Sequence, residues 1–411
     1  MIGLGSSLTS GVPESKYSLS LDGNNDYLSL NSLESQLSDD MAFSLSIWFK
    51  GGSNTGGGSN ILFSAHNSSY GNIIRIGVDA SGTRGIFFSD GGTSDHSGIG
   101  NVDLDDGAWH NLIVTRPAGA GGQQAKIYID GGSAITTDID DSDPSWTSAT
   151  RISIGQEYDG APPSGLTDEY EGLVNDFAFW NVELDDASRL KVYNAGKPFN
   201  LTINQGGYDN SSDLLGYWRM GNGSFDDKVN GVIHDQNNPG FGSELLLVPN
   251  FSNSGNLDNT TLNTLGYNIQ PDSAGGVSTA SVQNGELTIS VTTPHGNAGR
   301  VFMKCAGGVT LTEGNIYKAT YTVVSNSDFD GSDHFSIWDG DSYETVPHDV
   351  GTHVYYFSFT GSDRTSLPIQ LQGLNSGDAG IVLSNFSLVK LNGYPGLIPT
   401  DSDITFSSDT P

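Results

Sequence analysis

The chain has very little cysteine and few cationic side chains. Of its 411 residues one is cysteine, Cys305, so no disulfide can form within the chain. Cys305 follows a short apolar segment, and we interpret it as a small, buried apolar residue. Lysine and arginine number 17 against 48 acidic residues, which gives a formal net charge of −31. Phosphate binding needs a basic surface, so nucleic acid is not an expected partner, whereas cations are.

Long apolar runs and helical periodicity are also scarce. No stretch approaches the about 20 apolar residues that a membrane-spanning helix needs, so membrane insertion is not expected. Residues 1–7 lack the basic region and the apolar core of a secretory signal. Glycine is frequent, at 55 residues, and the apolar segments are short and alternating. The sequence therefore predicts an all-β fold, in which the only helix of note covers residues 185–197.

The pattern of strands and turns predicts two tandem antiparallel β-sandwiches. Residues 17–200 and 243–391 are the two predicted domains, and each contains a series of alternating strands. Residues 201–242 are rich in Asn, Gly and Asp and are predicted to be a connector. Residues 1–16 form a predicted N-terminal arm and residues 392–411 an extended C-terminal tail. Both are poor in core-forming residues, so we expect them to become ordered against partner chains.

Three stretches of the first domain resemble laminin-G-like and pentraxin-like lectin domains. Residues 106–116 read Asp-Gly-Ala-Trp-His-Asn-Leu-Ile-Val-Thr-Arg, which is similar to a strand entry of those domains. Residues 155–159 read Gly-Gln-Glu-Tyr-Asp, which is similar to the calcium-binding loop of pentraxins, and residues 172–181 resemble the strand after it. The resemblance implies a concanavalin A-like jelly roll. In this pattern Trp109 and His110 are expected to be a structural pair rather than catalytic or ligand-binding residues.

The resemblance to pentraxins also implies a site for one calcium ion. Carried over by position, the ligands are the carboxylates of Glu157 and Asp159, the main-chain carbonyl of Tyr158, Asp168 and Asn72. Carboxylates clustered in a turn suit a hard cation that seeks oxygen ligands, and a solvated acidic turn is the alternative. A glycine precedes Asn72 where pentraxins carry an aspartate, which argues for weaker affinity or for one ion where the family has two.

The second domain resembles jelly-roll carbohydrate-binding modules of the galactose-binding type. Residues 244–252 are similar to the opening strand of these modules, and residues 381–391 to the closing strand. The resemblance implies a second sandwich that binds carbohydrate. Exposed aromatic rings stack on sugars, which makes Trp338 and Tyr343 candidate ligand-binding residues. The alternative for Trp338 is packing in the core, because it and Ile337 point to opposite faces of one strand.

Catalysis is not expected. Concanavalin-like folds include glycoside hydrolases, which need two carboxylates beside the scissile bond. Their laminarinase-type pattern, Glu-x-Asp-x-x-Glu, is approached at residues 157–162, but Pro162 stands in place of the second glutamate.

The leading functional hypothesis is a non-catalytic virion structural protein of a bacteriophage, either a tail fibre or appendage component or a capsid-decorating protein. A tail that ends in Asp-Thr-Pro resembles those of marine bacteriophage virion proteins that carry the same two lectin-like domains. The expected partners are other virion proteins, glycans and further copies of the chain in a homo-oligomer. A bacterial cell-surface or secreted adhesin that binds polysaccharide is one alternative. An accessory region of a glycoside hydrolase is another.

The missing glutamate leads to a first prediction. We expect no sustained release of reducing sugar when the protein is incubated with laminarin or related glucans. Glu157→Gln serves as the control variant. Hydrolysis by the unmodified protein that this substitution abolishes would contradict the prediction.

Overall fold

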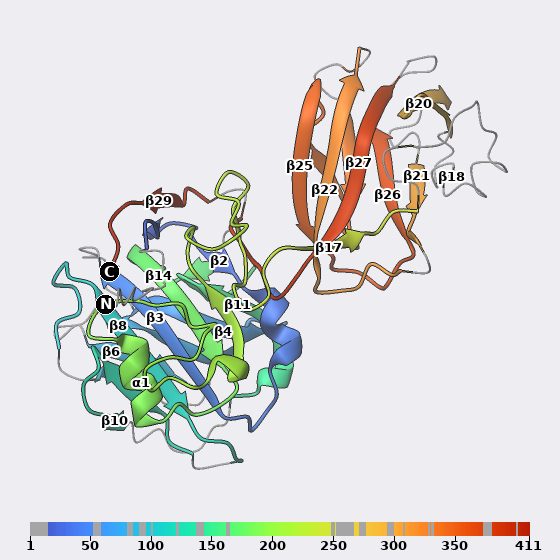
Figure 1. Cartoon of the computed structure of the whole chain (residues 1–411). Coiled ribbons are helices and arrows are strands. Elements are labelled where there is room, and N and C mark those ends of the chain that lie inside the picture. The colour runs from blue at the N-terminus through green and yellow to red at the C-terminus, as the bar shows by residue number, and fades with distance from the viewer. Residues whose placement is uncertain are drawn as a thin grey trace, which may run out of the picture. The chain divides into compact units, whose positions relative to one another are not determined.

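The chain forms two compact units, each built from antiparallel β-sheets (Figure 1). Unit 1 comprises residues 1–240 and 393–411, and unit 2 comprises residues 241–392. The predicted all-β class with two sandwiches is confirmed. No helix among the described residues is long and apolar enough to cross a membrane. The computed structural model describes residues 15–51, 59–79, 85–89, 96–99, 102–120, 123–136, 144–161, 165–247, 251, 267–270, 277–293, 300–306, 309–327, 329, 333–372, 380–399 and 402–411.

Unit 1 contains two large sheets, which we call sheet A and sheet B. In sheet A the order is β10-β9-β8-β3-β14-β1-β29, and β15 pairs with β14. Its strands are β1 (Ser18–Asp22), β3 (Phe43–Gly51), β8 (His110–Arg116), β9 (Lys126–Ile129), β10 (Ile135–Thr136), β14 (Glu171–Trp180), β15 (Leu214–Trp218) and β29 (Thr405–Ser407).

In sheet B the order is β16-β28-β2-β11-β4-β5-β6-β7. Its strands are β2 (Leu28–Ser29), β4 (Ser59–Asn67), β5 (Asn72–Asp79), β6 (Ile86–Ser89), β7 (His96–Ile99), β11 (Ala149–Ile154), β16 (Val232–Ile233) and β28 (Gly396–Leu397). A separate two-stranded sheet pairs β12 (Glu157–Tyr158) with β13 (Leu166–Thr167). Short 3₁₀ helices cover Asn31–Gln36, Trp146–Ser148 and Ser211–Asp213.

The helix α1 (Asp186–Tyr193) covers the outer face of sheet A. Asp185 caps its start by accepting a hydrogen bond from Ser188 N at 2.7 Å, and Asn194 ends it in the left-handed conformation. The predicted helix is therefore confirmed, with its end earlier than the glycine at position 196. Val192 of α1 and Ile113 of β8 are buried in one apolar cluster, and Tyr193 stacks on Trp48 of β3 at 5.9 Å. The outer face of sheet A is thus a second core.

Unit 2 is built from two sheets of six and five strands. The first has the order β19-β20-β27-β22-β25, with β17 beside β27, and the second has the order β18-β21-β26-β23-β24. The strands are β17 (Phe241–Glu244), β18 (Tyr267–Gln270), β19 (Val277–Gln283), β20 (Glu286–Thr293), β21 (Arg300–Lys304), β22 (Ile316–Ser325), β23 (His334–Trp338), β24 (Tyr343–Val346), β25 (Gly351–Ser358), β26 (Ser366–Gln372) and β27 (Ile381–Leu391).

Cys305 in unit 2 is 7% exposed, and burial raises the pKa of its thiol to about 11. Its interpretation as a small buried residue is therefore confirmed.

The predicted connector, residues 201–242, is for most of its length a part of unit 1. Strand β15 pairs with the second half of β14, and Trp218 at its end is fully buried. The strand also delivers Tyr217 to the apolar cluster under α1. Its loops are rich in Asn, Gly and Asp and suggested a linker, whereas residues 214–218, which are apolar enough to pack as a strand, form β15 and complete the core of unit 1.

The predicted tail, residues 392–411, is not an extended segment that waits for a partner chain. Strand β28 pairs with β2 and β16, and strand β29 pairs with β1 at the edge of sheet A (dark red in Figure 1). The buried carboxylate of Asp26 accepts hydrogen bonds from Ser402 Oγ at 2.6 Å and Asp403 N at 2.9 Å. Asp409 forms an ion pair with Lys50 at 2.7 Å. A strand of three residues leaves too little periodicity for sequence reasoning to find.

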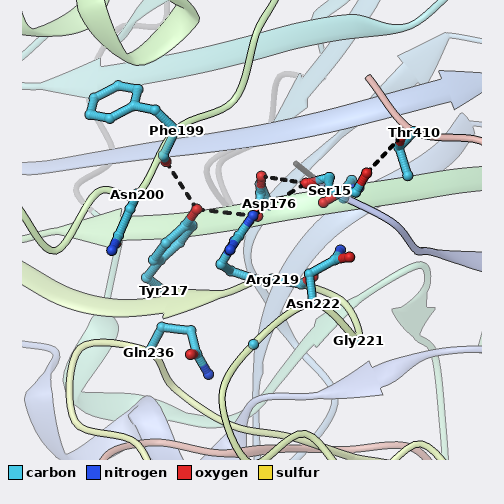
Figure 2. Close-up of polar contacts among 12 residues, drawn as sticks. Ser15, Asp176, Phe199, Asn200, Tyr217, Arg219, Gly221, Asn222, Gln236 and Thr410 are labelled. Atoms are coloured by element: carbon cyan, nitrogen blue, oxygen red, sulfur yellow. Dashed lines mark hydrogen bonds and ion pairs between the residues drawn. The ribbon is translucent and has the colours of Figure 1, made fainter. Parts of the chain in front are cut away.

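A buried polar cluster joins both ends of the described chain to the centre of sheet A (Figure 2). Asp176, in a bulge of β14, accepts hydrogen bonds from Arg219 Nε at 3.3 Å and Tyr217 Oη at 3.2 Å. Ser15 Oγ donates to the same carboxylate at 3.4 Å, and Thr410 Oγ1 donates to Ser15 O at 3.1 Å. The first described residue and the last strand are therefore fixed at one place. Of the predicted N-terminal arm, residues 1–14 lie outside the described residues.

The contacts of residues 402–411 predict that removing this segment destabilises unit 1. Removing residues 402–411 should lower the unfolding temperature of unit 1 by roughly 5–10 °C, because buried Asp26 loses two donors and Phe406 no longer packs on the core. Differential scanning calorimetry measures this shift, with Thr405→Ala, an exposed position in β29, as the control. An unchanged unfolding temperature would mean that the segment contributes little.

Candidate functional site

The outer face of sheet B contacts the segment that holds four of the five predicted metal ligands. Strand register places Arg75 of β5 beside Ser64 of β4, and Ser64 beside Ser153 of β11. One step along, Arg151 of β11 pairs with His66 of β4. Side chains two residues apart share a face of a sheet, so two arginines and a histidine lie on the side away from the apolar core.

The hairpin β12–β13 lies against this face, and with Asp159 and Asp168 we call it the acidic hairpin. Ser64 Oγ donates to Gln156 O at 2.6 Å, and Tyr158 N approaches His66 Nε2 at 3.4 Å. The ring of Tyr158 meets that of His66 edge-on at 5.4 Å. Burial lowers the pKa of His66 to about 4, and the charge of Arg75 acts in the same direction. His66 is therefore neutral at pH 7.

Glu157, the first predicted calcium ligand, forms an ion pair with Arg75. Arg75 Nη1 donates to Glu157 Oε2 at 2.7 Å, and the exposed fractions of the two side chains are 12% and 4%. Burial raises the pKa of Glu157, and the charges of Asp168 and Asp159 add to that increase. Asp168 and Asp159 are thus close enough to act electrostatically on Glu157. Sequence reasoning did not include Arg75, and the polar residue in Ile-Ile-Arg-Ile was the available signal.

The predicted ligands do not form a calcium cage in the conformation that the structure shows. Glu157 is bound to a cation already, and Asp159 Oδ2 accepts a hydrogen bond from Thr167 Oγ1 at 3.2 Å. Across the described part of the chain, no three His, Cys, Asp or Glu side chains converge as metal ligands. Asn72 lies on the same strand as Arg75, and its buried Oδ1 has no hydrogen-bond partner. Calcium binding by these residues stays a prediction.

The turn between β4 and β5 holds an aromatic ring beside Arg151. Tyr70 has a φ of 64°, in the left-handed region that is costly for a bulky side chain. Asn67 fixes this turn, because its Oδ1 accepts hydrogen bonds from Ser69 N at 2.8 Å and Gly71 N at 3.0 Å. The guanidinium carbon of Arg151 lies 4.2 Å from the centre of the Tyr70 ring, and its Nη1 donates to Asn67 O at 3.0 Å. Tyr70 and Arg151 therefore contact each other beside a turn that hydrogen bonds fix.

The two predicted ligand-binding residues of unit 2, Trp338 and Tyr343, contact each other. They are register partners of β23 and β24, and their rings meet edge-on at 4.9 Å. Trp338 also packs on the core of unit 2, and Arg364 lies 5.6 Å from its ring. The structure thus places Trp338 in contact with protein on several sides. Binding of a ligand by this pair stays a prediction.

An open pocket of about 480 Å³ lies elsewhere in unit 2. Phe329 and His348 provide two rings, with centres 5.3 Å apart. The carbonyl of His348 accepts a hydrogen bond from Asn326 Nδ2 at 2.8 Å, which fixes the wall of the pocket. Apolar and polar groups are mixed as in many ligand pockets. The lining residues are Asn326, Phe329, Thr345, Val346, Pro347, His348 and Asp349.

His110 is a structural residue, as the sequence pattern predicted. Its Nδ1 lies 2.7 Å from Asp130 Oδ2, and its Nε2 lies 3.1 Å from Asp106 Oδ1. The hydrogen bond to Asp130 is the largest cause of the raised pKa of His110. Trp109 donates through Nε1 to Asp409 Oδ1 at 2.8 Å and so holds the C-terminal segment.

One family model matches part of unit 1. Residues 22–188 match the family described as the concanavalin A-like lectin/glucanases superfamily, and this match covers less than half of the chain. No curated protein sequence matches the chain. The laminin-G-like part of the predicted resemblance is therefore confirmed for unit 1.

Several solved structures are similar to part of this chain. A heptameric SAP-like pentraxin from Limulus polyphemus is 17% identical, with 44% of this chain and 82% of that chain covered and a TM-score of 0.33. A CBM40 module of a Ruminococcus gnavus sialidase is 14% identical, with 43% and 97% covered and a TM-score of 0.32. Domain 4 of an extracellular arabinanase from Geobacillus stearothermophilus is 18% identical, with 43% and 75% covered and a TM-score of 0.31. At these TM-scores the similarities carry no argument about function.

The raised pKa of His110 predicts how its contribution to stability depends on pH. A histidine with a raised folded-state pKa stabilises fully below its unfolded value of about 6.5, and the contribution is lost as pH rises through the folded-state pKa. His110→Gln should therefore lower the unfolding temperature of unit 1 more at pH 6 than at pH 9. Calorimetry at both pH values provides the measurement. An equal loss of unfolding temperature at pH 6 and at pH 9 would contradict a stabilising role for the imidazolium of His110.

Proposed function

We propose that the chain is a non-catalytic carbohydrate-binding protein, and that unit 1 binds its glycan on the outer face of sheet B at Tyr70 and Arg151. The observation that carries this proposal is the left-handed φ of Tyr70, 64°, in a turn that Asn67 fixes. Backbone strain at an aromatic residue persists only where the surrounding structure maintains it, and such sites are often functional. The outer face of sheet A is not available, because α1 and the segment around Phe199 cover it.

The chemistry of this surface suits a hydroxyl-rich ring. An aromatic ring can pack on the apolar face of a sugar, and guanidinium, amide and carboxylate groups provide donors and acceptors for its hydroxyls. Tyr70, Arg151 and Asn67 supply the first part of this set, and the exposed Asp159 of the acidic hairpin supplies a carboxylate near His66. The net charge of −31 favours neutral glycans over strongly anionic ones.

Binding without catalysis fits the state of Glu157. Glycoside hydrolysis needs two carboxylates that face a cleft, one of them free to protonate the leaving group or to attack. Here the carboxylate of Glu157 is 3% exposed and paired with Arg75. The family that matches unit 1 includes glucanases, so a hydrolase remains the second candidate function. The glucan assay described above decides between the two.

A place in a bacteriophage particle is a separate part of the proposal. It rests on the sequence resemblance of the tail and on the pair of lectin-like sandwiches. The contacts of residues 402–411 within unit 1 leave the docking of this segment on other virion proteins without structural support. Mass spectrometry of purified phage particles tests the proposal directly. Detection of the chain on bacterial cell surfaces instead would favour the adhesin.

The proposed glycan site predicts the effect of two substitutions. Tyr70→Ala and Arg151→Ala should each weaken binding to a recognised polysaccharide about tenfold or more, because aromatic and arginine side chains supply most of the energy at binding surfaces. Affinity electrophoresis against a panel of neutral and acidic polysaccharides, followed by calorimetric titration, measures the change. Ile203→Ala, a 58% exposed apolar residue of unit 1 with ordinary backbone geometry, is the control. Equal affinity of all three variants would move the site elsewhere.

A further inference from the structure

We propose that the guanidinium of Arg75 takes the place of a metal ion at the acidic hairpin. The hairpin then keeps its shape on sheet B without calcium. This inference concerns a charge built into the fold, and its stability test does not depend on glycan binding. The affinity electrophoresis with glycan is the one arm of the experiment that rests on the proposed function.

The acidic hairpin requires a positive charge. Glu157 is 3% exposed, and the carboxylates of Asp159 and Asp168 lie near enough to act on it. A buried carboxylate beside two others is costly unless a cation compensates it. Arg75 Nη1, 2.7 Å from Glu157 Oε2, supplies that compensation from within the chain.

Arg75 can compensate the charge of Glu157 because its strand holds it in place. Arg75 lies in the middle of β5, between the buried residues Ile74 and Ile76, so its backbone is held on both sides by strands β4 and β6. The guanidinium stays protonated at every physiological pH, and its planar fork matches a carboxylate. A cation delivered by a rigid strand does not depend on its concentration in solution.

Hydrogen bonds within the chain close the rest of the hairpin. Asp159 N donates to Gly165 O at 2.8 Å, and Thr167 Oγ1 donates to Asp159 Oδ2 at 3.2 Å. The carbonyl of Asp168, a residue with a φ of 48°, accepts from Ile61 N at 2.8 Å and so joins the hairpin to β4. These contacts between protein groups close the hairpin and attach it to the sheet.

The experiment compares the full chain with Arg75→Met. The matched control is Arg151→Met, an arginine of the same sheet face that contacts Tyr70 and Asn67. Unfolding temperatures are measured by calorimetry with excess EDTA and with millimolar calcium, and calcium is titrated calorimetrically. The unmodified chain should unfold at the same temperature in both solutions and show no saturable heat. Arg75→Met should unfold roughly 5–15 °C lower in EDTA, and Arg151→Met much less.

A double variant separates charge from packing. Arg75→Met/Glu157→Leu removes both members of the pair, so no buried charge is left uncompensated, and it should regain most of the unfolding temperature that Arg75→Met loses. This comparison also covers the case in which Arg75→Met alone does not fold. If the double variant is as unstable as the single one, Arg75 acts by packing and the proposal is wrong.

Two further results would overturn the proposal. One is saturable calcium binding by the unmodified chain that Glu157→Gln removes. The other is an Arg75→Met variant as stable as the unmodified chain in EDTA. The arm that rests on the proposed function repeats affinity electrophoresis with EDTA and with calcium, and equal retardation is expected. Failure to find any glycan would remove this arm alone and leave the stability result intact.

Discussion

The buried ion pair between Asp176 and Arg219 is the contact on which the closure of unit 1 depends. Asp176 lies in the bulge of β14, the strand that pairs with β1, β3 and β15. Its carboxylate is fully buried, and burial raises its pKa while Arg219 opposes the increase. Removing either partner would leave a buried charge alone, which is among the most damaging changes a core can suffer. Ser15 donates a hydrogen bond to Asp176, and Thr410 donates one to Ser15. Both ends of the described chain are therefore attached to this ion pair.

Arginine is scarce in this chain and is used inside it. Lysine and arginine number 17 in 411 residues, yet Arg75 and Arg219 each form an ion pair with a buried carboxylate. An exposed arginine on so acidic a surface would gain little, because surface ion pairs contribute little and are screened by salt. A buried one decides whether a hairpin or a bulge can form at all. Two of the few cationic side chains therefore neutralise carboxylates in the interior of unit 1.

The sequence predicted the elements that repeat a pattern and missed those that depend on single residues. Alternation and turn residues located both sandwiches, and the pair Asp185 and Asp186 indicated the start of α1, where Asp185 is the cap. The resemblance around residues 155–159 indicated Glu157 and Asp159, which are local in sequence, and metal binding by them stays a prediction. The partner of Glu157 lies 82 residues away on another strand, and no local pattern indicates it. Strand β29 was not predicted for a similar reason, because its three residues pair with β1, near the other end of the chain.

The insertion of unit 2 into unit 1 gives the second unit a role in the stability of the first. Asp235 accepts hydrogen bonds from Tyr217 N at 3.0 Å and Tyr394 N at 3.2 Å, so the chain is fixed on either side of residues 241–392. When unit 2 is unfolded, β28 and β29 can reach their places only by closing a loop of about 150 residues, which costs roughly 4 kcal/mol in chain entropy. A folded unit 2 has already restricted that segment. Because β28 and β29 are short strands that contribute only a few kcal/mol, their attachment is the step most sensitive to this cost. Folding of unit 2 before the tail docks is therefore the order that the connectivity favours.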